Sequence, residues 1–169
     1  MSHDFSSFQP SVLFVQDVAG TYRPAQADEV LQAAQQLLLS RVRHADIFSS
    51  PHAVKDFLRV RLAGLEHEMF AVVHLDSQNR VIEYVEMFRG TVGQTSVYPR
   101  EVVKETLARN SAAVVLVHNH PSGAAQPSRA DEALTQTLKA ALALVDVRVL
   151  DHLIVAGAEV LSMAEKGLM

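Results

Sequence analysis

Two histidines and one acid are close together in the second half of the chain. His118 and His120 follow directly on the apolar run 112–117, which predicts a buried strand. Side chains alternate faces along a strand, so both imidazoles point one way and Asn119 points the other. Asp131 stands at the start of the next helical stretch, within reach. Two histidines and a carboxylate are three ligands, the number that catalytic zinc sites use when a fourth position stays open for water.

The alternative for the histidine pair is structural, with both rings hydrogen-bonded to nearby backbone. Pro121 should end the strand because it cannot donate to a sheet ladder, and Ser122 and Gly123 turn the chain. The buried strand before the pair, and the turn and acid after it, favour metal binding. The spacing by itself leaves both interpretations open.

Ser128 and Asp131 have a complete structural explanation. A serine followed three residues later by an acid, ahead of an apolar-periodic helix, is a capping box. The serine oxygen accepts from a helical N–H, and the acid bonds back. A helix start also fixes both side chains in space, so capping and a role in a metal site are compatible.

Glu66 and Glu68 flank His67 just before the predicted strand 69–75. The structural interpretation is a solvated helix end. The functional one is a general base, because a metal-activated water needs a nearby carboxylate to take its proton. That role requires strand 69–75 to neighbour the histidine strand.

Asp151 and His152 are adjacent polar residues inside an apolar strand. Alternation places them on opposite faces, so one of them should point inward. Either the polar group of this residue is hydrogen-bonded to the backbone, or it forms a hydrogen bond that orients a metal ligand. The two interpretations carry equal weight.

The composition restricts the class of protein. The 169 residues are 49% hydrophobic, enough for the core of one domain, and the formal net charge of −4 argues against a broad basic surface for nucleic acid. The absence of cysteine excludes disulfides, thiol nucleophiles and every cysteine-based zinc site. The N-terminus lacks a secretory signal and no apolar run is of membrane-spanning length, so a soluble cytoplasmic protein without a membrane partner is expected.

The order of predicted elements indicates an α/β fold with a mixed β-sheet flanked by helices. A short strand is predicted at 11–15, and residues 91–97 are expected to extend or bend a strand. Helices are predicted at 29–43, 51–65, 100–110 and 129–145. Further strands are predicted at 69–75, 81–88, 112–118, 147–155 and 160–162. The strand at 112–118 is apolar on both faces and should be central.

The site motif resembles the signature of the JAMM (MPN+) metalloproteases. The sequence around this motif resembles the RadC branch of that superfamily. The matching pieces lie in order over residues 46–169, at 75–82, 90–91, 98–103, 118–123, 127–131 and 150–155. Residues 1–45 would form an N-terminal arm with one helix.

This resemblance implies a JAMM/MPN fold, similar in layout to cytidine deaminases, and a zinc-dependent hydrolase that cleaves a peptide or isopeptide bond. One zinc ion would be held by His118, His120 and Asp131. Ser128 would stabilise the oxyanion, and Glu68 would be the general base because the family pattern is Glu-x-Phe leading into the strand. Deamination is set aside, since that zinc site needs cysteines.

The chain departs from longer RadC proteins, which carry a helix-hairpin-helix module that binds DNA backbone. Residues 1–45 are too short for this module and hold Gly20 as their only glycine, so the sequence leaves open whether the chain contacts DNA. The alternative function is a non-catalytic, metal-stabilised adaptor in DNA repair or mobile-element function. The expected partner of the hydrolase is a peptide or protein substrate, and no sequence feature indicates an oligomeric state.

Overall fold

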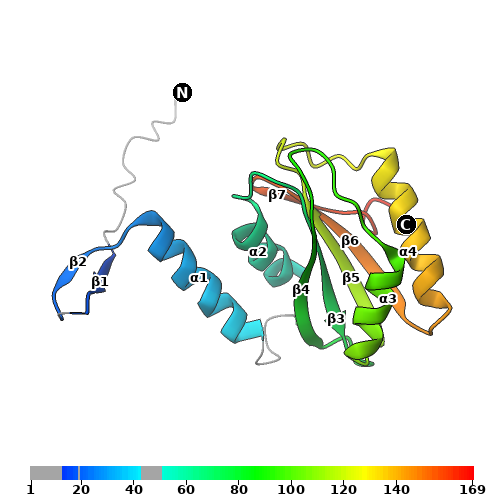
Figure 1. Cartoon of the computed structure of the whole chain (residues 1–169), viewed down its shortest axis with the longest axis horizontal. Helices are drawn as coiled ribbons and strands as arrows, with labels where there is room; N and C mark the ends of the chain where they lie inside the picture. Colours follow the sequence, from blue (N-terminus) through cyan, green and yellow to red (C-terminus); the bar gives the residue numbers. More distant parts are fainter. Residues whose placement is uncertain (1–12, 19, 43–50) are drawn as a thin grey trace, which may run out of the picture.

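The fold is built on a five-stranded mixed sheet with helices on both faces. The computed structural model describes residues 13–18, 20–42 and 51–169 (Figure 1). The sheet contains β3 (Met69–Leu75), β4 (Val81–Arg89), β5 (Ala113–Asn119), β6 (Arg148–Ala156) and β7 (Glu159–Ser162). The helices are α1 (Ala27–Val42), α2 (Pro51–Leu62), α3 (Pro99–Ala108) and α4 (Arg129–Ala143). The predicted mixed sheet flanked by helices is confirmed.

The strand order is β4-β3-β5-β6-β7, so β5 is the central strand. It pairs antiparallel with β3, where Phe70 lies opposite His118, and parallel with β6, where His118 lies opposite Ile154. A parallel pair needs a crossover, and α4 supplies it. The histidines therefore stand at the carboxyl end of the central strand, beside the loop that leads into α4.

The helices divide between the two faces of the sheet. Phe57, Leu58 and Leu62 of α2 pack on one face, while α3 and α4 cover the other through residues such as Val102 and Leu138. These five side chains are at most 1% exposed. Because β5 is covered on both sides, its side chains are apolar in both directions, as the sequence pattern predicts.

Residues 91–97 do not extend β4 and instead form a loop. The chain folds back there because Gly90 N donates to the carbonyl of Glu68, and Thr91 N donates to the carbonyl of Gln94. The glycine leaves room for this turn. The expectation of a continued strand was wrong for this reason.

The N-terminal elements form an arm beside α2, away from α3 and α4 (Figure 1). A short hairpin joins β1 (Phe14–Gln16) to β2 (Tyr22–Pro24), and α1 follows. The predicted strand at 11–15 overlaps β1, although its first two residues lie outside the described part of the chain. Strand β2 was not predicted. Within the described ranges, no helix is long and apolar enough to cross a bilayer.

Candidate metal centre

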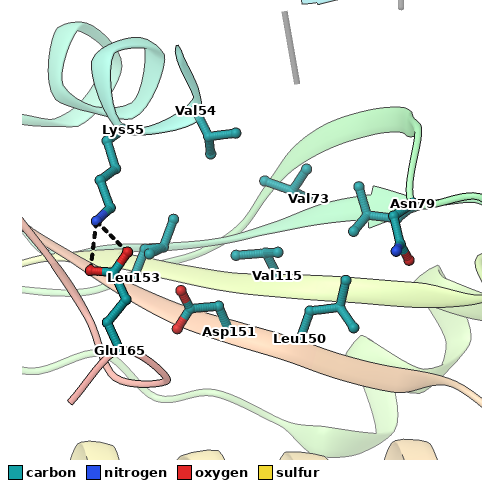
Figure 2. Close-up of a pocket in the computed structure, with 10 residues that line it drawn as sticks. Val54, Lys55, Val73, Asn79, Val115, Leu150, Asp151, Leu153 and Glu165 are labelled. Carbon is teal, nitrogen blue, oxygen red and sulfur yellow. Dashed lines mark hydrogen bonds and ion pairs between the residues drawn. The ribbon is translucent and has the colours of Figure 1, made fainter. Parts of the chain in front are cut away.

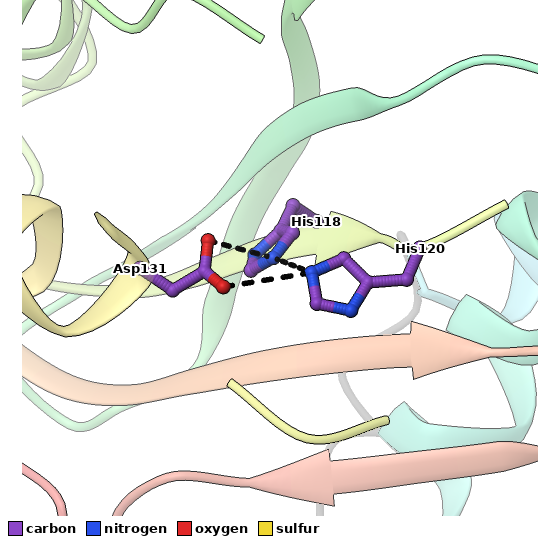
Figure 3. Close-up of side chains that lie close together, drawn as sticks. All are labelled: His118, His120 and Asp131. Carbon is purple, nitrogen blue, oxygen red and sulfur yellow. Dashed lines mark hydrogen bonds and ion pairs between the residues drawn. The ribbon is translucent and has the colours of Figure 1, made fainter. Parts of the chain in front are cut away.

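His118, His120 and Asp131 converge at the end of β5 (Figure 3). The Nε2 atoms of the two histidines lie 2.9 Å apart. Asp131 Oδ1 lies 3.3 Å from Nε2 of His118, and Oδ2 lies 3.6 Å from Nε2 of His120. Strand alternation brings the two imidazoles to one face, and the first turn of α4 brings the carboxylate to meet them.

These separations fit a single metal ion. Two ligand atoms about 2.0–2.1 Å from one tetrahedral ion lie roughly 3.3 Å from each other, and the three distances here are 2.9, 3.3 and 3.6 Å. The side chains of His118, His120 and Asp131 are only 6%, 14% and 16% exposed. The group can therefore bind a metal ion with little competition from bulk water.

Nδ1 of each histidine contacts a protein atom on the far side from the other two residues of the group, so Nε2 of each ring faces the group. Nδ1 of His120 lies 2.7 Å from the carbonyl oxygen of Ala124, to which it must donate. Nδ1 of His118 lies 2.8 Å from Nε2 of His152. Partners of this kind fix the ring orientation and tautomer of metal-binding histidines. His152 is fully buried.

The electrostatic environment keeps Asp131 charged. Burial acts to raise the pKa of Asp131, but the interactions with His118, His120 and Ser128 outweigh it and hold the pKa well below its usual range. The nearby carboxylate of Asp131 raises the pKa of His120, while burial acts in the opposite direction. Burial, followed by the charge of His118, holds the pKa of His152 well below its ordinary value.

The capping box is present in full at the start of α4. Ser128 N and Oγ both donate to Asp131 Oδ2, at 2.7 and 2.6 Å, and Asp131 N donates to Ser128 Oγ at 3.1 Å. Ser128 also lines the cleft that contains His120 and Asp131. The same two residues thus cap the start of α4 and border the candidate site.

Glu68 reaches the same cleft from the start of β3. Its backbone is fixed on one side by β4 and the loop, because Glu68 N donates to Thr91 O and Gly90 N donates to Glu68 O, both at 2.8 Å. The negative charge of Glu68 contributes to the raised pKa of His120, after larger contributions led by Asp131. Glu66, the other acid considered, is exposed and is absent from the cleft lining.

Asn119, between the two histidines, fixes Glu68 on the other side. Its Oδ1 accepts from Met69 N at 2.7 Å, and its Nδ2 donates to the carbonyl of His67 at 3.0 Å. The amide is 2% exposed. One side chain therefore binds the backbone of both neighbours of Glu68.

The cleft over the metal ligands has a volume of about 490 Å³. One wall is the loop after β4, with Val92, Thr95 and Val97, and the other is the start of α4, with Ala130 and Leu134. The walls carry apolar side chains together with the polar Gln94 and Thr95, and the polar residues His120, Asp131, Glu68 and Ser128 line the cleft as well. A cleft of this size and mixed lining can admit a ligand that has both apolar and polar groups.

Asp151 and His152 point to opposite faces of β6, as predicted, and only His152 reaches the metal ligands. Asp151 lies on the α2 face, beside a cavity of about 240 Å³ bordered by the Lys55–Glu165 ion pair (Figure 2). Its carboxylate accepts from Ser162 Oγ at 2.6 Å and from two backbone N–H groups, those of His152 and Ala164. Asp151 thus secures the chain after β7 and does not support the candidate site.

Two polar residues of this region were missed in the sequence. Asn119 was placed only by its direction along the strand, and nothing nearby in the sequence shows that it binds the backbone before β3. Thr135 is fully buried, one helical turn after Asp131, and its Oγ1 lies 2.6 Å from Nδ1 of His152. A polar residue in line with the buried positions Leu138 and Leu142 of α4 was the available sign.

Comparison with known proteins identifies the domain. The model of the RadC-like JAB domain family matches residues 48–168. A UPF0758 protein of Methylibium petroleiphilum is 59% identical over 150 residues, which are 89% of this chain and 68% of that protein. A UPF0758 protein of Acidovorax sp. is 61% identical over 150 residues, 89% of this chain and 63% of its own length.

The chain thus spans about two thirds of the length of these curated relatives. The five-stranded mixed sheet with helices on both faces is consistent with a JAB/MPN-like fold, as the resemblance in the sequence implied. Most of the chain is matched by the family model, and identity to the relatives is close to 60%. We conclude that the chain belongs to the RadC-like JAB domain family.

Proposed function

We propose that this protein is a zinc-dependent hydrolase that cleaves a peptide or isopeptide bond in a peptide or protein substrate. One observation carries the proposal: His120 and Asp131 line the same cleft as the carboxylate of Glu68 and the hydroxyl of Ser128, and His118 lies directly against these two candidate ligands. The cleft has a volume of about 490 Å³, and its walls carry both apolar and polar side chains. Membership of the RadC-like JAB domain family supports a metal at this position.

The ligand set suits zinc. His118 and His120 would bind through Nε2 and Asp131 through its carboxylate, which leaves a fourth position open, as in catalytic zinc sites. Imidazole nitrogen and carboxylate oxygen are donors that zinc accepts, and the site has no thiolate. Zinc held there would supply Lewis-acid activation of water and of the scissile carbonyl.

Glu68 is proposed as the general base. The backbone around Glu68 is held on both sides, by Asn119 and by the turn at Gly90. The point from which the Glu68 side chain extends into the cleft is therefore fixed. A carboxylate there can take a proton from the attacking water and pass it to the leaving amine. Proton transfer of this kind typically contributes about 10²–10⁴-fold to the rate.

Ser128 is proposed to stabilise the oxyanion that forms on the scissile carbonyl. Its hydroxyl donates to Asp131 Oδ2 in the present structure. A carboxylate that has a metal ion as its partner needs this hydrogen bond less, and a hydroxyl rotates freely to a new acceptor. The backbone N–H of Ser128 continues to hold Asp131.

The test compares the parent with Glu68→Gln, Glu66→Gln and Asp131→Asn. Zinc content is measured by atomic emission, and cleavage is measured by mass spectrometry on a proteome-derived peptide library and a panel of isopeptide-linked conjugates. We expect Glu68→Gln to keep zinc and lose cleavage, and Asp131→Asn to lose zinc. Glu66→Gln is the matched control, because this exposed acid is two residues away and should change neither property.

Different outcomes would overturn different parts of the proposal. Equal cleavage by Glu68→Gln would remove only the assignment of the base. Full zinc occupancy without cleavage of any substrate would contradict the hydrolase, and would favour the metal-stabilised adaptor considered in the sequence analysis. A parent protein that takes up no zinc would contradict the zinc site itself.

A further inference from the structure

A continuous chain of buried hydrogen bonds runs behind the candidate metal centre. Nδ1 of His118 lies 2.8 Å from Nε2 of His152, and Nδ1 of His152 lies 2.6 Å from Thr135 Oγ1. Thr135 Oγ1 lies 2.6 Å from the carbonyl oxygen of Asp131. The chain therefore starts at one metal ligand on β5, crosses β6 and ends at another metal ligand on α4.

The position of each hydrogen in this chain follows from its last member. A carbonyl oxygen has no hydrogen, so Thr135 must donate to Asp131. A hydroxyl has one hydrogen, so Thr135 can only accept from His152, and Nδ1 of His152 carries the hydrogen. Only one nitrogen of a neutral imidazole carries a hydrogen. Nε2 of His152 therefore accepts from Nδ1 of His118.

In the neutral ring of His118, the form that binds a metal, Nε2 then has a lone pair, and this atom faces His120 and Asp131. We infer that Thr135 and His152 are positioning residues that set the tautomer of His118 for metal binding and join its strand to the helix that carries Asp131. This inference rests on the metal site of the proposed function. Both residues are fully buried, so water does not offer alternative partners.

Thr135→Val is the sharpest perturbation of this chain. Valine has nearly the shape of threonine but neither donates nor accepts, so Nδ1 of His152 loses its acceptor. His152 is then free to carry its hydrogen on Nε2, where it meets the Nδ1 hydrogen of His118. His118 must shift its own hydrogen to Nε2, the atom needed by the metal.

The experiment measures zinc affinity by competition with a chromogenic chelator. We expect Thr135→Val to raise the zinc Kd roughly 10–100-fold, the usual effect of losing a partner of a metal ligand. Thr135→Ser restores the hydroxyl and should bind zinc as the parent does. Thr106→Val is the matched control, because Thr106 is also a fully buried helical threonine and its hydroxyl has no partner among the described residues.

A second measurement reads the tautomers directly in the metal-free protein. Long-range ¹H–¹⁵N correlation spectra of histidine-labelled protein should show the hydrogen of His118 and of His152 on Nδ1, and a changed pattern in Thr135→Val. A parent with hydrogen on Nε2 of His118 would overturn the inference whether or not zinc binds. If the parent binds zinc and Thr135→Val binds it equally well, the inference fails and the proposed hydrolase stands.

Discussion

Ser128 and Asp131 hold each other at the beginning of α4 by three hydrogen bonds between 2.6 and 3.1 Å. All the bonds that Asp131 accepts from Ser128 go to Oδ2, while Oδ1 lies 3.3 Å from Nε2 of His118. One carboxylate therefore caps the start of α4 with Oδ2 and faces His118 with Oδ1. Helix stability and site geometry are connected through this residue.

Ser128→Ala should lower the free energy of unfolding of the metal-free protein by about 1 kcal/mol, the usual effect of removing an N-cap hydroxyl. Ser128→Thr keeps the hydroxyl and should stay close to the parent. Urea unfolding in the presence of a chelator measures this difference. Equal stability of the alanine variant and the parent would show that the cap contributes nothing.

Asn119→Asp should weaken the attachment of the segment that carries Glu68. The carboxylate still accepts from Met69 N, but it faces the carbonyl of His67, to which Asn119 donated. A buried acceptor without its donor costs roughly 1–3 kcal/mol, and the free energy of unfolding should fall by that amount. Amide hydrogen exchange at Glu68 and Met69 should accelerate. Unchanged exchange there would contradict the bridging role of Asn119.

The sequence predicted those features of the site that depend on local periodicity. Alternation along β5 placed His118 and His120 on one face, and the spacing of Ser128 and Asp131 indicated a helix start. The strong apolar pattern of residues 112–117 placed β5 at the centre of the sheet. Each of these inferences uses residues that are near each other in the chain.

Features of the site that depend on contacts between residues far apart in the sequence could not be predicted from local sequence patterns. Alternation separated Asp151 from His152 but could not show which of them faces α4, because that depends on how the helices divide between the faces. The register of β5 and β6 also shifts between Val114 and Val115. The bonds from Asn119 to the backbone before β3 span about fifty residues of sequence.

Gly90→Ala should displace the loop that forms one wall of the cleft. A Cβ at Gly90 would overlap Gln94 O and Thr95 Oγ1 and would come within 2.8 Å of Thr95 Cα. Backbone atoms cannot move aside as a flexible side chain does, so we expect a loss of roughly 1–3 kcal/mol in stability. Gly93→Ala is the matched control, since a Cβ there meets nothing within 4 Å. Thermal unfolding of both variants tests the difference, and equal melting temperatures would contradict it.

His74 should make the protein less stable in mild acid. The ring is fully buried, Nδ1 lies 3.0 Å from Ser111 Oγ, and Nε2 has no partner in the described structure. Burial, together with the charge of Arg109, lowers the pKa of His74 from 6.5 to about 4, while Glu105 and Glu83 act in the opposite direction. Between these two pH values the unfolded chain binds a proton at His74 that the folded protein does not. The free energy of unfolding should therefore fall as the pH is lowered from 6.5 to 4, by on the order of 3 kcal/mol from this residue.

His74→Gln isolates this contribution, because glutamine does not titrate while the other groups stay the same. Urea unfolding of the parent and the variant is measured from pH 4 to pH 7 with a chelator present, so that metal binding does not enter. Above pH 6.5 the difference in stability between the two proteins should be constant. Below it, the parent should lose stability relative to the variant, since only the parent has an unfolded state that gains this proton. Parallel stability curves over the whole range would show that His74 titrates alike in the folded and unfolded chains.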